Sequence, residues 1–420
     1  MTPTRRPRLG SRLGPCLAPR LASALALTAL AGCTAPRDAA NLEPVATGNG
    51  YQAQYRDFDT PGDQVYLRAK TMNMERCRAS AGGDGSTGKG SGRPPAALAG
   101  DVLSRGDLVR VRLIEDTEFS GDYVISRDGT LKLPYLAPIP AQGRSTAAVA
   151  ADLRQALVAG DYYLDAPDLS VLVMDYAAAR VAVSGAVFDP QGLDIGGVPG
   201  DQVDTLRQSA LGASTEGRNL SVALRGVGGI RPDADLSAVR ITRDGTQYTL
   251  DLRGMITGHD ALDVMLITGD EIYVPSRQCF QDDLMVPSQI SPPGVSLYLS
   301  NLTQPATANA QSAIGQTVRE VPYGTRYMQA VVDSNCVGGA RATSASRSAA
   351  LFSRNPMTDV SVVMERSVEV MRARADRDDY DPYLLPGDAI ACYDSAVTNI
   401  SEVARVVGLF GAAVAISTLP

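Results

Sequence analysis

The chain has 420 residues, of which 44% are hydrophobic and 20% are charged, a composition typical of a globular protein with several domains. Aromatic residues make up 5%, tryptophan is absent and His259 is the single histidine, which excludes a metal site or proton relay built from several histidines. The formal net charge is −7, and the first 32 residues hold five arginines and no acid, so the remainder is more acidic still. Such a chain repels phosphate backbones, which argues against nucleic acid as a partner.

Residues 1–32 have the pattern of a secretory signal peptide. Arginines precede an apolar run that ends at Leu30, and small residues follow it. The run is too short to span a bilayer permanently. Leu30-Ala31-Gly32-Cys33 resembles the lipobox of bacterial lipoproteins, which implies a lipidated Cys33 (palmitate among its acyl chains), and Thr34 then implies delivery to the outer membrane. An ordinary secretory signal is the alternative, and it also exports the chain.

The cysteines are expected to pair, because thiols outside the cytoplasm tend to be oxidised. Once the signal peptide is removed and Cys33 is lipidated, an even number remains, with three possible pairings. None shows the short spacing of a zinc site. We favour Cys336 with Cys392, since both fall in one predicted domain. The candidate disulfide cysteines are Cys77, Cys279, Cys336 and Cys392.

Residues 33–100 are expected to be an N-terminal segment that ends in a flexible linker. The stretch from Gly82 to Gly92 is rich in glycine and serine, a composition that cannot bury a core. It partly matches a phosphate-binding loop, but Gly90 stands where that loop needs Ser or Thr, and no apolar strand precedes it. The linker interpretation therefore stands.

Residues 101–178 predict a small mixed α+β domain. Alternating apolar and charged residues predict half-buried strands, and an Asp-Gly dipeptide between two such runs predicts a hairpin. Apolar residues at helical spacing after Ser145, which can act as a cap, predict a helix. The expected elements are strands over 108–113, 123–127, 130–133 and 169–173, a turn at Asp128-Gly129, and a helix from Ser145 to Gly160.

The remainder repeats one set of signals after about 110 residues. Val227-Gly228-Gly229 returns as Val337-Gly338-Gly339, and Gly269-Asp270 returns as Gly387-Asp388. Two copies of one domain are therefore expected. The copies span 179–278 and 290–395, with strands near 181–187, 269–274, 348–353 and 360–364, a helix over 220–226 and a hairpin over 239–252 across Asp244-Gly245.

These motifs together resemble the polysaccharide export domain of Wza-type outer-membrane export proteins. The similarity rests on Gly106-Asp107, on Ser120-Gly121 before Tyr123, and on Asp128-Gly129-Thr130-Leu131. The repeated units resemble the soluble-ligand-binding β-grasp (SLBB) domains that accompany it. The second copy diverges, since Val295–Asn301 lacks the Val-x-Gly-x-Val-x2-Pro-x-Gly form of the first. The resemblance implies an α+β fold with one export domain, two β-grasp-like domains and a C-terminal transmembrane amphipathic helix.

Residues 398–420 are expected to form that helix. The twenty residues from 399 to 418 would span about 30 Å, close to the hydrocarbon thickness of a bilayer. Bulky residues share one side and small residues another, which suits lipid contact and close helix packing. A buried core helix is the alternative. The residues assigned to the membrane helix are Val403, Ala404, Val407, Gly408, Phe410, Gly411, Val414 and Ala415.

No enzyme, metal or cofactor pattern is present in the sequence. The acidic cluster at Asp376, Asp378, Asp379 and Asp381 lacks the glycine and glutamate of a calcium loop, and the arginines between its acids predict a solvated, salt-bridged connector. His259 lies in a segment expected to be an exposed loop. Nothing favours catalysis.

The resemblance implies a bacterial outer-membrane lipoprotein, mostly periplasmic, that forms a homo-oligomer, typically an octamer. The assembly would be a porin-like translocon that exports capsular or extracellular polysaccharide from the periplasm to the cell surface. The implied partners are the polysaccharide substrate, outer-membrane lipid and an inner-membrane polysaccharide co-polymerase. The alternative is a periplasm-facing glycan-binding lipoprotein that does not itself form a pore.

Overall fold

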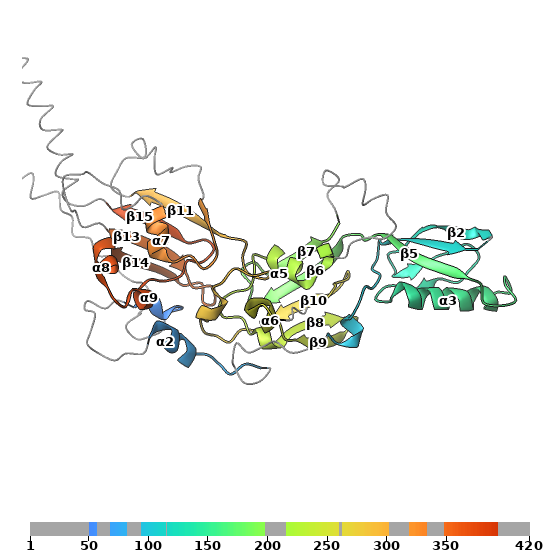
Figure 1. The fold of residues 1–420 in the computed structure, drawn as a ribbon, viewed down its shortest axis with the longest axis horizontal. Helices are drawn as coiled ribbons and strands as arrows, with labels where there is room; N and C mark the ends of the chain where they lie inside the picture. The colour runs from blue at the N-terminus through green and yellow to red at the C-terminus, as the bar shows by residue number, and fades with distance from the viewer. Residues whose placement is uncertain are drawn as a thin grey trace, which may run out of the picture.

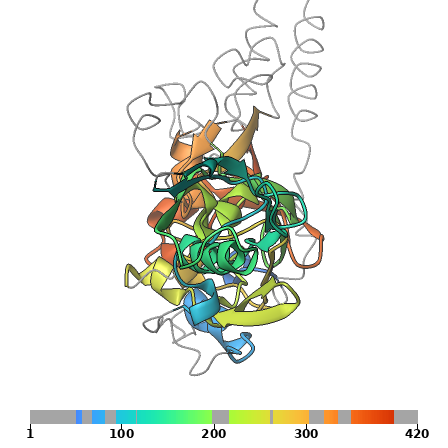
Figure 2. The same ribbon diagram turned by 90° about the vertical axis from the view of Figure 1, so that its right-hand side faces the viewer.

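The computed structural model describes residues 50–56, 68–81, 94–114, 116–197, 216–259, 263–301, 319–333 and 348–393. Helices and sheets are both present, so the α+β fold class predicted from the sequence is confirmed. One three-stranded and two five-stranded sheets define three modules, which lie in a row along the long axis of the molecule (Figure 1). Seen from the end of that row, the three-stranded module lies in front of the other two (Figure 2).

The three-stranded module is an antiparallel sheet of order β2-β1-β5 with one helix packed on one face. Val109 and Val111 of β1 and Leu153 of the helix are fully buried in its core. Ser145 caps the helix by accepting the backbone N–H of Ala148 at 3.3 Å, as predicted. The elements are β1 (Leu108–Leu113), β2 (Asp116–Val124), β3 (Thr130–Leu131), β4 (Ile139–Pro140), α3 (Thr146–Ala159) and β5 (Leu169–Asp175).

The hairpin expected across Asp128-Gly129 is wrong in its strand pairing. The turn itself is present: Gly129 has a φ of 79°, and the Ser126 N–H donates to the Thr130 carbonyl at 2.9 Å. However, β2 pairs along its length with β1, and β3 pairs with β4 instead. The chain after β2 stays paired with the chain before β1, because the Ile125 N–H donates to the Asp107 carbonyl and the Gly106 N–H donates to the Ile125 carbonyl, both at 2.9 Å.

The first five-stranded module has the sheet order β7-β6-β10-β8-β9, in which β6 and β10 run parallel and the other neighbours antiparallel. The predicted hairpin across Asp244-Gly245 is confirmed, and both residues have the positive φ that a tight hairpin turn requires. The elements are β6 (Ala179–Gly185), β7 (Gln191–Ile195), η4 (Glu216–Arg218), α5 (Leu220–Gly226), η5 (Leu236–Ala238), β8 (Val239–Arg243), β9 (Thr246–Leu250), α6 (Arg253–Thr257), β10 (Glu271–Val274) and η6 (Asp282–Leu284).

The second five-stranded module has the same order and strand directions as the first. Its order β12-β11-β15-β13-β14 again contains one parallel pair, β11 with β15, in the same place. Val337-Gly338-Gly339, which helped to predict a repeat, lies outside the described residues. The elements are β11 (Val295–Asn301), β12 (Arg319–Val321), α7 (Tyr327–Asp333), β13 (Ser348–Arg354), β14 (Ser361–Ser367), α8 (Val368–Ala373), α9 (Arg377–Tyr380) and β15 (Ala389–Tyr393).

The N-terminal segment packs against the second five-stranded module, although the three-stranded module follows it in sequence. Tyr51 and Tyr55 belong to the apolar core of the second module. In Figure 1 the segment, drawn in blue, lies beside α9 at the end of the row opposite to the three-stranded module. Leu98 is instead buried in the core of the first five-stranded module. The short elements of this part are η2 (Ala53–Tyr55), α2 (Ala69–Glu75) and η3 (Ala96–Leu98).

Candidate functional site

One Gly-Asp turn occurs in each of the three modules and begins a core strand there. In each turn the glycine has a φ between 89° and 100°, a backbone conformation that glycine adopts without strain. The aspartate carboxylate accepts the backbone N–H of the residue three positions earlier, at 2.7 to 2.9 Å. The turns are Ser104 to Asp107, Ile267 to Asp270 and Leu385 to Asp388.

The first of these aspartates joins two modules. The Asp107 carboxylate accepts a hydrogen bond from Arg218 of the first five-stranded module at 2.8 Å, and both side chains are almost fully buried. Burial raises the pKa of Asp107, and the positive charge of Arg218 opposes that rise. Ser104 Oγ also accepts the Thr268 N–H across the boundary at 3.0 Å. The two modules are therefore held together by buried polar contacts, whose loss would leave a charge unpaired.

The other two aspartates have different partners. Asp270 forms a two-pronged ion pair with Arg243 of β8, at 2.9 and 2.6 Å. Asp388 instead has a side-chain hydrogen bond with Ser353. The Ser353 Oγ also accepts a hydrogen bond from the Tyr55 hydroxyl at 3.1 Å. Burial raises the pKa of Asp388 to about 7. The N-terminal segment thus completes the turn of the second five-stranded module.

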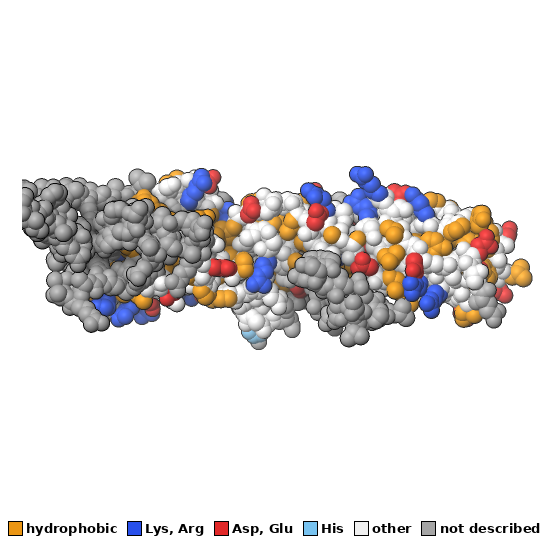
Figure 3. All heavy atoms as spheres, turned by 90° about the horizontal axis from the view of Figure 1, so that it is seen from above, with side chains coloured by type: hydrophobic (Ala, Val, Ile, Leu, Met, Phe, Trp, Pro, Cys, Tyr) orange, Lys and Arg blue, Asp and Glu red, His pale blue; other side chains and the backbone are white. Residues whose placement is uncertain are grey.

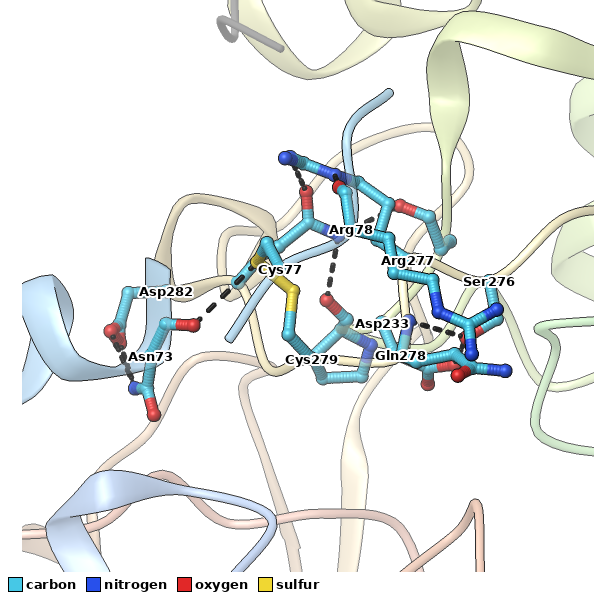
Figure 4. Close-up of a disulfide and its surroundings, with 12 residues drawn as sticks. Asn73, Cys77, Arg78, Asp233, Ser276, Arg277, Gln278, Cys279 and Asp282 are labelled. Atoms are coloured by element: carbon cyan, nitrogen blue, oxygen red, sulfur yellow. Dashed lines mark hydrogen bonds between the residues drawn. A yellow bond between two sulfur atoms is a disulfide. The ribbon is translucent and has the colours of Figure 1, made fainter. Parts of the chain in front are cut away.

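A disulfide links the N-terminal segment to the connection between the two five-stranded modules. Cys77 is bonded to Cys279, with the Cα atoms 4.8 Å apart and 202 residues between them in sequence. Beside it, the Asn73 amide donates to the Asp282 carboxylate at 3.1 Å, and the Arg78 N–H donates to the Arg277 carbonyl at 3.0 Å (Figure 4). These contacts make the segment an integral part of the folded body.

This bond is part of one of the three pairings open from the sequence. It leaves Cys336 and Cys392 as the other two candidates, the pair that the sequence favoured. Cys392 is disulfide-bonded, whereas Cys336 lies outside the described residues. In the sequence, Cys77 with Cys279 follows only as the pair that remains when Cys336 is paired with Cys392, and no local motif indicates it.

The end of the three-stranded module that points away from the rest of the molecule carries exposed apolar side chains. Ile114 is 71% exposed, Tyr135 73% and Leu164 100%. The Tyr162 hydroxyl donates to the Tyr135 carbonyl at 3.3 Å and its ring packs edge-on against Phe119, which fixes the loop after α3. Hydrophobic side chains are visible at this end in Figure 3. Exposed apolar patches of this kind mark contact surfaces in soluble proteins. We call Ile114, Tyr135, Tyr162 and Leu164 the apolar tip.

The acidic cluster predicted as a connector makes structural contacts. The Asp379 carboxylate accepts the Ala69 N–H and the Asp381 carboxylate accepts the Met328 N–H, at 2.8 and 2.9 Å, while Asp376 pairs with Arg374. Burial raises the pKa of Asp381 to about 6. Among the described residues no group of three or more His, Cys, Asp or Glu could hold a metal ion.

The remaining predicted residues fall into two groups. His259 is exposed in the turn after α6, as predicted, and its Nδ1 lies 3.1 Å from the Thr257 hydroxyl. Within the part of the chain that the structure describes, no helix has both the length and the apolar character needed to cross a membrane. Cys33 and the predicted helix over 398–420, with all its assigned residues, lie outside that part.

Sequence reasoning missed two buried residues that join distant segments of the chain. Tyr55 and Arg218 are buried and each forms contacts far away in sequence, to Ser353 and to Asp107. Neither lies in a recognisable motif. The only available signal was the spacing of Tyr51 and Tyr55, two large aromatic residues in a chain with few of them.

Comparisons with known proteins point to one family. Residues 96–174 match the family model described as "Polysaccharide biosynthesis/export protein", and these residues include the whole sheet of the three-stranded module except the last residue of β5. The chain is 27% identical over 183 residues to "EPS I polysaccharide export outer membrane protein EpsA" of Ralstonia solanacearum, covering 42% of this chain and 43% of that protein. A second EpsA, from Ralstonia nicotianae, is 27% identical over 157 residues, 37% of this chain and 36% of that protein.

The matched regions thus span less than half the length of these curated relatives. The family is one of export proteins and not of enzymes, in agreement with the sequence analysis. These matches confirm the resemblance to Wza-type polysaccharide export proteins that the sequence predicted.

Proposed function

We propose that this chain is an outer-membrane lipoprotein whose copies assemble into a translocon for capsular or extracellular polysaccharide. Each copy would be anchored by lipidated Cys33, would contribute residues 398–420 to a membrane-spanning helical barrel, and would extend its three modules into the periplasm. The two five-stranded modules would be β-grasp domains. The matched relatives, named as polysaccharide export outer membrane proteins, support the export role and the membrane.

The position of the first and last described residues in the fold is the observation that carries this proposal. The segment that begins at Gly50 and the strand that ends at Tyr393 both belong to the second five-stranded module. Cys33 lies only 17 residues before Gly50, and residue 398 only five after Tyr393. A lipid anchor and a membrane helix attached there would hold the same end of the molecule at one bilayer. The three-stranded module would then point away from it (Figure 1).

The proposed orientation gives the apolar tip a role. A module that points away from the outer membrane faces the inner membrane, where polysaccharide is made and transported. We propose that the tip contacts an inner-membrane polysaccharide co-polymerase. The buried pair of Asp107 and Arg218 would keep the tip in line with the remainder of the subunit.

Deletion of residues 399–420 tests the pore. Surface polysaccharide is measured by antibody labelling of intact cells, and lipidation by incorporation of labelled palmitate. If the segment forms the channel, surface polysaccharide disappears while the protein is still exported and lipidated. Unchanged surface polysaccharide would favour a glycan-binding lipoprotein without a pore.

Electron microscopy of the detergent-extracted protein tests the assembly. Ring-shaped particles with several copies, crowned by a detergent belt at the end with the second five-stranded module, are expected. The matched control is Cys33→Ala, which removes the acyl site but leaves the modules unchanged. A single-copy particle from the wild-type chain would contradict the translocon.

A further inference from the structure

The sheet of the first five-stranded module has one face open to solvent. Along the three inner strands β6, β10 and β8, residues alternate between the apolar core and this second face. On the core side lie Val181, Val183 and Ile272, all almost fully buried. No helix of the described residues packs on the open face, where side chains are exposed or half-buried. The strand β10 lies at the centre of the sheet, between β6 and β8 (Figure 1).

A single large aromatic side chain stands in the middle of this face. Tyr273 of β10 is 41% exposed, and the guanidinium carbon of Arg240, its neighbour on β8, lies 4.4 Å from the ring centroid. A cation stacked on one ring face holds the ring upright. On the other side, the neighbour of Tyr273 on β6 is Ser184, a small residue. The second ring face is therefore not filled by a bulky side chain of the adjacent strand.

The polar groups beside Tyr273 keep their hydrogen-bonding capacity. Arg240 forms no ion pair or hydrogen bond with the described residues, so the stacked ring is what holds its guanidinium. Glu271, two residues before Tyr273 on the same face, is exposed and also forms no ion pair there. An aromatic platform with an acid on one side and a guanidinium on the other matches the surface of a sugar. The C–H groups of a pyranose stack on the negative face of a ring, and its hydroxyl groups both donate and accept.

We propose that the open face of the first five-stranded sheet binds the exported polysaccharide, with one sugar ring stacked on Tyr273. Glu271 accepts hydrogen bonds from its hydroxyl groups and Arg240 donates to them. The inference rests on the proposed export function. A second copy of this chain fits the face less well, because a stable interface needs about 800 Å² on each side with an apolar centre, and Tyr273 is the one large apolar side chain on the face among the described residues.

The second five-stranded module lacks the site. Asp270 and Asp388 occupy equivalent turns of the two modules, so Tyr273 corresponds to Ala391. Arg240, the neighbour of Tyr273 on the adjacent strand, corresponds to Ala350, the neighbour of Ala391. Neither alanine offers a ring or a charge. The repeat has therefore kept the fold in both copies and the binding chemistry in one. The second module still has an exposed tyrosine, Tyr298, and it provides a matched control.

Binding of oligosaccharides to the purified full-length protein tests the proposal. The probe is the extracellular polysaccharide of the strain that encodes the chain, cut to short oligosaccharides by mild acid. Tyr273→Ala is expected to weaken binding about tenfold or more, whereas Tyr273→Phe, which keeps the platform, changes it less than about twofold. Arg240→Gln weakens binding too, and Tyr298→Ala leaves it unchanged. Because Tyr273 is exposed, the variants keep the melting temperature of the wild type.

Three results would overturn the site. They are no binding to the wild-type protein, equal binding by Tyr273→Ala, and a change in sedimentation by Tyr273→Ala without a change in binding, which would make the face a contact between copies. Surface polysaccharide of a strain without the gene separates this failure from that of the proposed function. If the glycan disappears from the surface in that strain, export stands even where the Tyr273 site fails.

Discussion

The two five-stranded modules share one topology but complete their cores differently. In the first module, Arg243 of β8 pairs with the buried Asp270 of the Gly-Asp turn. At the corresponding position the second module has Ser353, and Tyr55 of the N-terminal segment reaches in to contact it. The buried aspartate of the first module is thus paired within its own sheet, although Leu98 from the segment before the three-stranded module also packs in its core. The second module depends on a distant segment of the chain, the one that the proposed lipid anchor precedes.

This difference agrees with two separate tasks that we propose for the two copies of the repeated fold. The first module, whose buried aspartate is paired within its own sheet, would act as a rigid spacer and, with Tyr273 and Arg240, as the proposed binding surface. A module completed by the N-terminal segment is linked mechanically to that segment, and the Cys77–Cys279 bond reinforces the link. A mechanical force on the proposed lipid anchor would therefore be transmitted to the second five-stranded module, which would lie next to the membrane.

Arg243→Met is expected to have the largest effect, because it leaves the Asp270 carboxylate buried without its partner. Both side chains are almost fully buried, so the loss is expected to be about 3–5 kcal/mol in the free energy of unfolding. Urea unfolding measures the loss, and hydrogen exchange of β8 and β10 assigns it to the first module. In the double variant Arg243→Met with Asp270→Asn much of the loss is recovered. A loss spread equally over both five-stranded modules would contradict their independence.

Tyr55→Ala tests whether the N-terminal segment belongs to the second module. Tyr55 is 1% exposed, and removal of a buried aromatic ring leaves a cavity that costs about 3 kcal/mol. Faster exchange is expected in β13 and β15, and none in β6 or β10. Tyr55→Phe keeps the ring but removes the hydroxyl that donates to Ser353 and accepts from the Gln52 amide, and it costs about 1 kcal/mol. The control Tyr135→Ala alters an exposed side chain and stays within about 0.5 kcal/mol of the wild type.

Loss of the disulfide is expected to have a smaller effect. The double variant Cys77→Ser with Cys279→Ser opens a loop of about 200 residues and is expected to cost about 2 kcal/mol. The effect is moderate because Asn73 and Asp282 still hold α2 by hydrogen bonds. Limited proteolysis measures how firmly the segment between 68 and 81 is held. Cleavage in this segment is expected to be faster in the double variant than in the wild type. Equal cleavage with and without the bond would mean that the disulfide does not hold the segment.

Elements with local signals were predicted well. The Ser145 cap and the apolar spacing of Val149, Leu153 and Leu157 predict α3 to within a residue, and Asp244-Gly245 predicts its hairpin. Such features are decided by residues near one another in sequence. The strand pairing of β2 was wrong because a turn dipeptide reports a change of direction and not which strand becomes the neighbour.

Contacts between segments far apart in sequence could not be predicted. Arg218 with Asp107 and Tyr55 with Ser353 join residues 111 and 298 positions apart. No periodicity or motif reports such a distance, and only the folded arrangement brings them together. The Gly-Asp turns were visible in the sequence, but their aspartates are equivalent in the turn and different in their partners. The Tyr273 platform was likewise hidden, because an exposed tyrosine in a strand has the same pattern as a solvent-facing one without a role.

The pH dependence of the second module gives the finest test of the comparison. Burial raises the pKa of Asp388 to about 7, from an ordinary value of 3.8, and no arginine of the described residues pairs with it as Arg243 does with Asp270. The folded chain therefore holds a proton on Asp388 over a range in which the unfolded chain has released it. As the pH rises from about 4 to about 7, the free energy of unfolding falls, by at most ~1.4 kcal/mol per pH unit, and above that range this group adds no further change.

Asp388→Asn keeps an oxygen that can accept the Leu385 N–H but cannot ionise, so it is expected to flatten this slope. Urea unfolding at pH 5 and pH 7.5, followed by near-ultraviolet circular dichroism, measures the slope. Asp165→Asn, an exposed acid in the three-stranded module, is the control and keeps the slope of the wild type. If Asp388→Asn also kept the slope of the wild type, a protonated Asp388 would not be what distinguishes the second module from the first. The contacts of Ser353 and Tyr55 would then be sufficient to stabilise the ionised Asp388 carboxylate.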